Sequence, residues 1–432
     1  MIPTLLFAAF IFMMLMGVPI GAALGLAGAT CIALANTDAP WFGLLAVPQN
    51  FYAGLGKYPL LAIPLFVLVG SIFDRSGVAL RLVNFAIALV GRGPGMLPMV
   101  AILVAMFLGG ISGSGPANAA AVGAVMITAM SRAGYPPAFS ASVVGAAAAT
   151  DILIPPSVAF IVYSVLVPGA SVPALFAAGM IPGILAGLAL IVPTVWMARK
   201  HKMGSLESSL PRPRLRQSFK EAIWGLAAPV LILGGMRAGW FTPTEAAVVA
   251  VVYSLLIGLF VYREIKFKDL YGIILAAAKT SSVVMFLVAA ALVSAWLITI
   301  ANIPAQVVDM LRPFIDNPTL LMVMLMLMVL IVGTALDFAP TVLILTPVLM
   351  PLVREAGINP VYFGVLFIIN NAIGLLTPPV GTVLNVVCGV GRIPMHEVIR
   401  GVMPFLISQV VVMGLLIAFP ILVMGPLKWL SS

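Results

Sequence analysis

One acidic side chain stands out because it lies deep in an apolar stretch. Asp337 follows Gly333-Thr334 and precedes Pro340, and long apolar segments extend on both sides of it. A carboxylate in such surroundings is costly unless a cation, a proton or a polar partner compensates it, so it is a functional candidate by default. We therefore expect Asp337 to bind a cation or a proton.

Glycine, serine and proline interrupt the apolar sequence around this residue and at a matching place earlier in the chain. The earlier segment is Gly109-Gly-Ile-Ser-Gly-Ser-Gly-Pro116, and its counterpart is Gly333-Thr-Ala-Leu-Asp-Phe-Ala-Pro340. The apolar run Met96 to Gly109 would give about 21 Å of helix, which is less than the roughly 30 Å of bilayer hydrocarbon. A short apolar run, a Gly/Ser tip and a second run predict a re-entrant helical hairpin, with tips at 109–116 and 333–340. Such tips are tolerated only where they are buried in protein or line a water-filled cavity.

A Pro-Pro pair marks a second kind of interruption. Ile154-Pro-Pro-Ser157 corresponds to Thr377-Pro-Pro-Val-Gly-Thr382. Two adjacent prolines remove two amide donors and disfavour helix in the residue before them, so we expect broken helices at 151–157 and 374–382. Unwound carbonyls and helix ends at such breaks can bind ions.

Oxygen ligands for a hard cation such as sodium are concentrated at these interruptions. The candidate side chains are Ser112, Ser114, Ser157, Thr334, Asp337, Thr377 and Thr382. For each serine or threonine alone, close helix packing is an equally good explanation. Their clustering at paired break points favours a function.

Other polar residues leave two interpretations open. Asp151 precedes the first Pro-Pro pair, and it is either functional or a cap or helix contact; its counterpart is Gly374. Asn118, Asn370 and Asn371 either contact a substrate or tie helices together.

The composition identifies the environment in which these residues act. Of 432 residues, 62% are hydrophobic and 8% are charged, whereas soluble domains have about 25% charged residues. A soluble fold and a disordered chain are both excluded. With about 20 residues per crossing, we expect an all-α polytopic membrane protein with about 12 membrane segments.

The basic residues predict the orientation. Seven of them lie in the polar stretch Arg199 to Lys220, and Arg263, Lys266 and Lys268 form a second cluster. Short basic loops face the cytoplasm, so we expect loop 199–220 there and both termini on the periplasmic side. This explains the net charge of +9 without nucleic-acid binding. Cys31 and Cys388 have no redox or metal spacing.

The chain contains an internal repeat. Pro137 and Pro155-Pro156 recur 223 positions later as Pro360 and Pro378-Pro379, and Gly109 recurs as Gly333. Proline and glycine determine backbone shape, so shared positions indicate a shared backbone plan. The first copy ends at the basic stretch, whereas only Lys428 follows the second. This asymmetry predicts inverted topology, a recurring design of secondary transporters.

These features divide the sequence into five predicted parts. Residues 1–57 form an N-terminal span, either one long kinked helix or a span with a re-entrant piece, and an interfacial helix. The others are repeat one at 58–198, the basic loop and two linking spans at 199–281, repeat two at 282–421, and a C-terminal end at 422–432.

At these motifs the chain resembles the large membrane (M) subunit of tripartite ATP-independent periplasmic (TRAP) transporters over nearly its whole length. The motifs that carry the resemblance are Phe107-Leu-Gly-Gly-Ile-Ser-Gly-Ser-Gly-Pro-Ala117 with Arg132-Ala-Gly-Tyr135, Ile154-Pro-Pro-Ser157, Gly179-Met-Ile-Pro-Gly183, Asp337 with Pro340, Pro347 and Pro351, and Leu376-Thr-Pro-Pro-Val-Gly381.

The resemblance implies a multi-pass transporter of the bacterial inner membrane that works by an elevator mechanism and is not an enzyme. A small membrane subunit and a periplasmic substrate-binding protein are its implied partners, beside the lipid bilayer. The binding protein delivers an organic acid of the C4-dicarboxylate, sugar-acid or sialic-acid class. A sodium gradient drives uptake, so Na+ is the expected coupling ion.

The family's sites are carried over to matching positions. The first sodium site involves Ser112, Gly113 and Ser114 with Pro155, Pro156 and Ser157. The second involves Gly333, Thr334 and Asp337 with Thr377, Pro378 and Gly381. Substrate lies between the hairpin tips, with Ser114, Asn118, Asp151 and Thr382 as candidate contacts. Asp151 departs from the family pattern and would repel a simple dicarboxylate unless it is neutralised.

Other protein classes fit less well. An intramembrane aspartyl protease would use Asp151 and Asp337, but Ala335-Leu336 precede Asp337 where its Gly-x-Gly-Asp motif is required. A metalloprotease lacks its His-Glu-x-x-His motif, and an ion channel does not need paired broken hairpins. A stand-alone sodium–carboxylate symporter of related inverted-hairpin architecture, without a binding protein, remains the nearest alternative.

Overall fold

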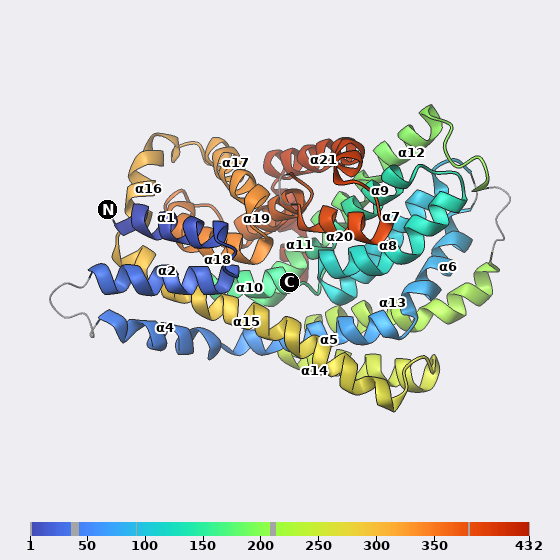
Figure 1. Ribbon diagram of the computed structural model, residues 1–432, viewed down its shortest axis with the longest axis horizontal. Helices are drawn as coiled ribbons and strands as arrows, with labels where there is room; N and C mark the ends of the chain where they lie inside the picture. Colours follow the sequence, from blue (N-terminus) through green and yellow to red (C-terminus); the bar gives the residue numbers. More distant parts are fainter. Residues whose placement is uncertain (1, 36–42, 92, 208–212, 379–380, 432) are drawn as a thin grey trace.

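The computed structural model describes residues 2–35, 43–91, 93–207, 213–378 and 381–431 (Figure 1). All regular elements in these ranges are helical, as the composition predicts. The first group of helices is α1 (Ile2–Leu15), α2 (Ile20–Ala35), α4 (Ala46–Leu55), η1 (Tyr58–Leu61), α5 (Ala62–Arg75) and α6 (Val78–Val90).

The two predicted repeats contain the hairpins. The first comprises α7 (Met96–Ser112), α8 (Gly115–Arg132), α9 (Pro137–Thr150), η2 (Asp151–Leu153), α10 (Val158–Leu166), α11 (Val172–Ala189) and α12 (Ile191–Lys200). The linking helices are α13 (Leu215–Arg237), α14 (Pro243–Leu256), η4 (Ile257–Val261) and η5 (Phe267–Asp269). The second comprises α15 (Leu270–Ile300), α16 (Ile303–Leu311), η6 (Arg312–Phe314), α17 (Pro318–Ala335), α18 (Phe338–Glu355), α19 (Pro360–Leu375), α20 (Thr382–Gly391), α21 (Met395–Ala418) and α22 (Ile421–Ser431).

Within the described ranges, seven helices are long and apolar enough to cross a membrane. The broken pair Pro137–Leu153 and Val158–Leu166, bent by 41°, makes an eighth. Several other apolar helices have only 10–17 residues, including the first helix of each hairpin. A polytopic membrane protein is thus confirmed, and the expected total of about 12 segments stays a prediction.

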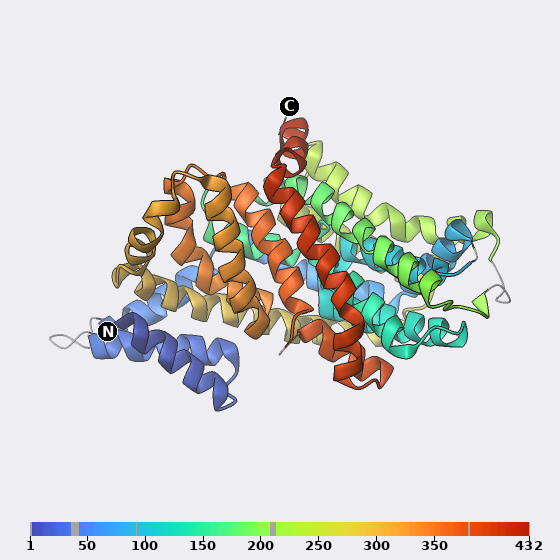
Figure 2. The ribbon, with the colours of Figure 1, turned by 90° about the horizontal axis from the view of Figure 1, so that it is seen from above.

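The N-terminal region differs from one of the two predicted forms. α1 and α2 pack side by side and run in opposite directions, joined by a tight turn with Gly17 at a φ of 82° (Figures 1 and 2). One long kinked helix over Ile2–Ala35 is therefore wrong. Left-handed backbone is easily adopted by glycine, so Gly17-Val-Pro19 reverses the chain instead of bending it.

The helices of the two repeats interlock across the centre of the molecule. α20, which follows the second Pro-Pro break, packs against α8 and α9 of the first repeat. α10, which follows the first break, packs against α18 and α19 of the second. Figure 1 shows α20 beside α8 and α10 beside α18. The helices that follow the breaks thus pack against the opposite repeat, while the inversion of one repeat relative to the other stays a prediction.

In each repeat, one close crossing holds the hairpin to the segment that precedes the break, and the two crossings lie at matching positions. In the second repeat, a methyl group on Gly374 of α19 would lie 2.7 Å from the carbonyl oxygen of Gly333 of α17. In the first repeat, a methyl group on Gly109 of α7 would lie 2.8 Å from Cβ of Asp151. Glycine is required on at least one side of each crossing because the backbones approach so closely.

The polar stretch between the repeats begins with an ordered anchor. Gly204 and Leu206 donate backbone hydrogen bonds to Gly134 and Ala133 at 3.3 and 3.2 Å. The buried Glu207 carboxylate accepts from the Leu97 amide at 2.8 Å and from the Tyr135 hydroxyl. The end of repeat one is thus fastened to the start of α7. The link between helices is shorter than the predicted loop 199–220, because α12 extends to Lys200 and α13 begins at Leu215.

We predict that Gly374→Ala lowers the melting temperature of the purified protein. The added methyl group overlaps the Gly333 carbonyl and forces α17 and α19 apart, which costs about 1–3 kcal/mol. Gly414→Ala in α21 is the control, because nothing lies within 4 Å of its added methyl group and alanine favours helix. Equal melting temperatures for the two variants in thermal-shift measurements would contradict the crossing.

A second prediction concerns pH. Burial raises the pKa of Glu207, against the opposing effect of hydrogen bonds from Tyr135, Leu97 and Gly93. The folded state therefore holds this proton to higher pH than the unfolded chain, whose glutamate titrates at about 4.3. Stability contributed in this way is present at low pH and is lost as pH rises through the raised pKa. As pH rises through the raised pKa, the melting temperature of the wild type should fall relative to that of Glu207→Gln. A difference in melting temperature between the two proteins that does not change with pH would contradict the raised pKa of Glu207.

Candidate functional site

The tip of the first hairpin lies directly against the first Pro-Pro break. Gly113, with a φ of 58°, ends α7, and a methyl group there would lie 2.8 Å from the Pro156 carbonyl oxygen and 3.1 Å from Cα of Ser157. A methyl group on Gly110 would lie 3.4 Å from the Pro155 carbonyl oxygen. The carbonyls of both prolines, which are joined by a cis peptide bond, therefore face the hairpin.

The serines predicted for this site have different roles in the structure. Ser157 is buried, and its hydroxyl donates to the Ile152 carbonyl at 2.5 Å. Ser114 is half-buried in extended backbone and precedes α8. The side chain of Ser112 lies outside the part that the structure describes. Gly113 of the predicted first sodium site thus lies against Pro156 and Ser157, and sodium binding there stays a prediction.

Asp151 and Asn118 form a buried pair next to this tip. Nδ2 of Asn118 donates to Oδ2 of Asp151, and both residues are at most 1% exposed. Oδ1 of Asp151 is buried, and no described residue forms a hydrogen bond with it. The pair ties α8 to η2, so the structure shows a helix contact for both residues. Their predicted contact with substrate stays untested.

At the tip of the second hairpin, the side chain of Asp337 contacts the first residues of two helices, α18 and α20. Its Oδ1 accepts from the Phe338 amide at 2.8 Å and thereby caps the N-terminus of α18. The same oxygen accepts a longer bond, 3.5 Å, from the hydroxyl of Thr382 at the start of α20. Carboxylates are favourable at helix N-termini. The side chain is only half-buried, so Asp337 is both held in place and reachable.

The remaining residues of the predicted second site lie on both sides of Asp337. The hydroxyls of Thr334 and Thr377 donate to the carbonyls of Ile331 and Ile373 in their own helices, at 2.8 and 2.7 Å. Their oxygens remain acceptors. Gly333 contacts the helix before the second break, Pro378 is half-buried, and Gly381 has a φ of 45°. Pro379 and Val380 of the second Pro-Pro motif lie outside the described residues.

The paired asparagines of α19 bind backbone carbonyls. Nδ2 of Asn370 donates to the Met326 carbonyl of α17, and Nδ2 of Asn371 donates to the Phe367 carbonyl at 2.9 Å. Asn370 thus ties two helices together, which is one of the two roles expected from the sequence.

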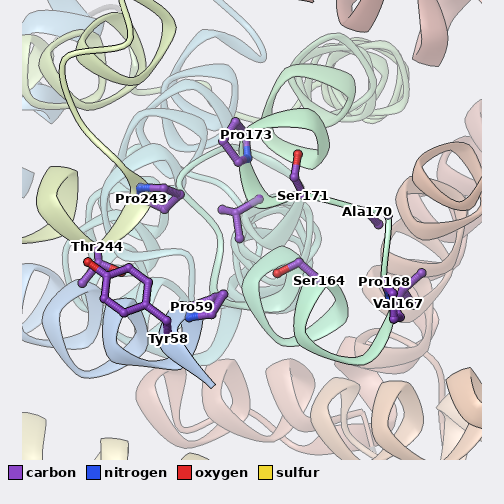
Figure 3. Close-up of a pocket in the computed structure, with 12 residues that line it drawn as sticks. Tyr58, Pro59, Ser164, Val167, Pro168, Ala170, Ser171, Pro173, Pro243 and Thr244 are labelled. Carbon is purple, nitrogen blue, oxygen red and sulfur yellow. The ribbon is translucent and has the colours of Figure 1, made fainter. Parts of the chain in front are cut away.

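A cavity of about 350 Å³ lies away from the hairpin tips (Figure 3). It is bordered by η1, by the link between α10 and α11, and by the start of α14, and Tyr58, Ser164, Ser171 and Thr244 supply its polar groups. None of its lining residues is charged. It contains neither the break points nor Asp337, so the hairpin tips are the better candidate for ion and substrate binding.

The comparison with protein families decides the identity of the chain. The model of the "Tripartite ATP-independent periplasmic transporter, DctM component" family matches residues 7–422. The chain belongs to this family. The prediction of a TRAP large membrane subunit is therefore confirmed, and the alternative of an intramembrane protease is set aside.

Individual relatives agree over nearly the full length. A putative TRAP transporter large permease protein of Haemophilus influenzae is 44% identical and aligns over 96% of this chain and 97% of its own. The 2,3-diketo-L-gulonate TRAP transporter large permease protein YiaN of Escherichia coli is 43% identical, with 96% of each chain covered. The C4-dicarboxylate TRAP transporter large permease protein DctM of Pseudomonas aeruginosa is 37% identical, with 94% of each covered.

A solved structure supports the fold independently. The YdaH transporter of Alcanivorax borkumensis matches with a TM-score of 0.69 at 14% sequence identity, over 94% of this chain and 98% of the other. This TRAP permease component is thus a multi-pass protein of the inner membrane with a transporter fold.

The contact between the first tip and the first break gives a third prediction. Gly113→Ala places a methyl group 2.8 Å from the Pro156 carbonyl and also strains the left-handed backbone, so reconstituted substrate uptake should fall strongly. Gly239→Ala is the control, because its φ is 71° but nothing lies within 4 Å of the added group. A similar loss of uptake in both variants would show that backbone strain alone, and not the tip contact, is responsible.

Proposed function

We propose that this TRAP permease carries out uptake of an organic acid driven by a sodium gradient. The acid is of the C4-dicarboxylate, sugar-acid or sialic-acid class, and a periplasmic substrate-binding protein delivers it. A small membrane subunit packs beside the permease. The names of two relatives, which specify 2,3-diketo-L-gulonate and C4-dicarboxylates, support a carboxylate substrate.

The observation that carries the proposal is the position of Asp337. Its carboxylate lies at the second hairpin tip, where it is held by the N-terminus of α18. It also accepts a hydrogen bond from Thr382, which follows the second Pro-Pro break. A cation bound by this carboxylate and by the neighbouring Gly333, Thr334, Thr377 and Gly381 would join the second hairpin to the second break. The Pro155 and Pro156 carbonyls offer the equivalent place at the first tip.

Helix ends supply a means of holding the acid. The tips 109–116 and 333–340 contain no lysine or arginine, so a basic side chain at the tips does not pair with the substrate. Four helices begin at the tips and breaks, namely α8, α10, α18 and α20. Helix N-termini favour anions through their free amides and dipole. A carboxylate between the tips would therefore be recognised by these ends, near Ser114 and Thr382.

The same arrangement supports the elevator movement that we propose. The hairpins and broken helices interlock, so they move as one body against the other helices and carry substrate and sodium together. The basic stretch after α12 faces the cytoplasm in this proposal, and both termini are periplasmic.

We predict that Asp337→Asn abolishes sodium-stimulated uptake in proteoliposomes while the protein still assembles in the membrane. The variant removes the charge that binds the cation and keeps the size of the side chain. Asp309→Asn, an exposed residue of α16, is the control and should transport normally. Unchanged sodium dependence in Asp337→Asn would reject the site.

The same assay distinguishes the stand-alone symporter. Proteoliposomes containing this permease and its small subunit should take up substrate only when the binding protein is present outside. Uptake of equal rate without the binding protein would reject the tripartite mechanism.

A further inference from the structure

Asp151 is a buried acidic group that the sodium proposal does not use. Its side chain is 0% exposed, Oδ2 accepts from Asn118, and Oδ1 has no hydrogen-bond partner among the residues that the structure describes. Removing a carboxylate from water without a compensating charge costs several kcal/mol. The protein therefore needs a positive charge or a proton at this carboxyl.

The surrounding helices supply no cation. η2 packs against α7, α8, α9, α10, α11 and α19. The one charged residue on these six helices is Arg132, which is about 21 Å along α8 from Asn118 at 1.5 Å per residue. The titratable groups that remain are two tyrosines, and the hydroxyls of Tyr163 and Tyr362 donate to the carbonyls of Pro360 and Leu416.

The geometry at the crossing favours a proton over a metal ion. A methyl group on Gly109 would lie 2.8, 2.9 and 3.0 Å from Cβ, Cα and Cγ of Asp151. The side-chain carbons of Asp151 thus lie against the backbone of α7, and a sodium ion at the carboxyl would require additional space for itself and its several oxygen ligands. A proton on Oδ1 needs no additional volume, and it removes the charge.

We propose that Asp151, held by Asn118, is a proton-binding site of this permease, and that one proton moves inward with the substrate in each cycle. The inference rests on the proposed transport function. The Asn118–Asp151 bond joins the first hairpin to the first break, so the pair travels with the body that moves in the proposed elevator mechanism, and the carboxyl is opened to water on each side of the membrane in turn. Oδ1 takes a proton from the outer solution and releases it to the cytoplasmic side. Gly374 occupies the equivalent crossing of the second repeat, so each chain holds one such site.

This assignment changes the expectation about substrates. The sequence suggested that the charge of Asp151 would repel a dicarboxylate unless it was neutralised. A protonated Asp151 has no charge, so it is compatible with a dianionic substrate between the hairpin tips.

The test uses the complete transporter, with its small subunit and binding protein, in proteoliposomes. Uptake is measured at a fixed inward sodium gradient, with and without an inward proton gradient and with the membrane potential clamped. The ratio of the two rates should exceed one in the wild type and should equal one in Asp151→Asn, which keeps the size and can still bond to Asn118. Glu207→Gln, which removes another buried carboxyl far from the tips, should keep the wild-type ratio.

An infrared measurement reads the proton directly and does not depend on transport. The carbonyl stretching band of a neutral carboxylic acid should be present in the wild type and reduced in Asp151→Asn. If the wild type takes up substrate with sodium but at the same rate with and without the proton gradient, the proton-site inference is wrong and the proposed sodium-driven function is unaffected. The same ratio in Asp151→Asn as in the wild type, or an unchanged infrared band, also overturns it. A wild type without any sodium-driven uptake contradicts the proposed function instead.

Discussion

The structure depends on one constraint, which is that backbone polar groups cannot be left without partners in the hydrocarbon of a membrane. This chain interrupts its helices at two hairpin tips and two Pro-Pro motifs. Each interruption frees amides or carbonyls, so each must be enclosed by protein. The interlocking of α20 with α8 and α9, and of α10 with α18 and α19, provides that enclosure. The features that create binding groups therefore also force the two halves of the chain together.

The positions that the two predicted repeats share in sequence make their differences informative. At one crossing Gly333 meets Gly374, and at the other Gly109 meets Asp151. At the crossings the carboxyl lies in the first repeat, but at the hairpin tips it lies in the second. The second tip has Asp337, and the first has uncharged Gly and Ser residues at the matching place. Counting only the tips and the crossings, each half thus carries one carboxyl, and the two differ in burial. Asp337 is half-buried and bonded to Thr382, whereas Asp151 is fully buried and bonded to Asn118. In the two proposals above, these carboxyls bind different cations, a metal ion at Asp337 and a proton at Asp151.

Much of this architecture could be predicted from the sequence because glycine and proline act locally. A Pro-Pro pair disfavours helix in the residue before it, so the break after α9 was predictable, whereas the repeat inferred from the matched positions of these residues stays a prediction. The sequence did not predict the anchor formed by Glu207, since its partners Leu97 and Tyr135 lie 110 and 72 positions away. A buried hydrogen bond between distant residues leaves no local pattern. The reversal at Gly17 was ambiguous for the opposite reason, because glycine permits both a kink and a turn.

The sequence by itself determined the membrane environment, the interruptions and the oxygen-bearing side chains placed at them. It did so because hydrophobicity and backbone preference are properties of single residues and short segments. Only the tertiary structure decided which interruption faces which: that the Pro155 and Pro156 carbonyls face the first tip, and that Thr382 reaches Asp337. It also decided that Asp151 is enclosed by helices without a cation. These are relations between segments far apart in the chain, and packing of the whole fold determines them.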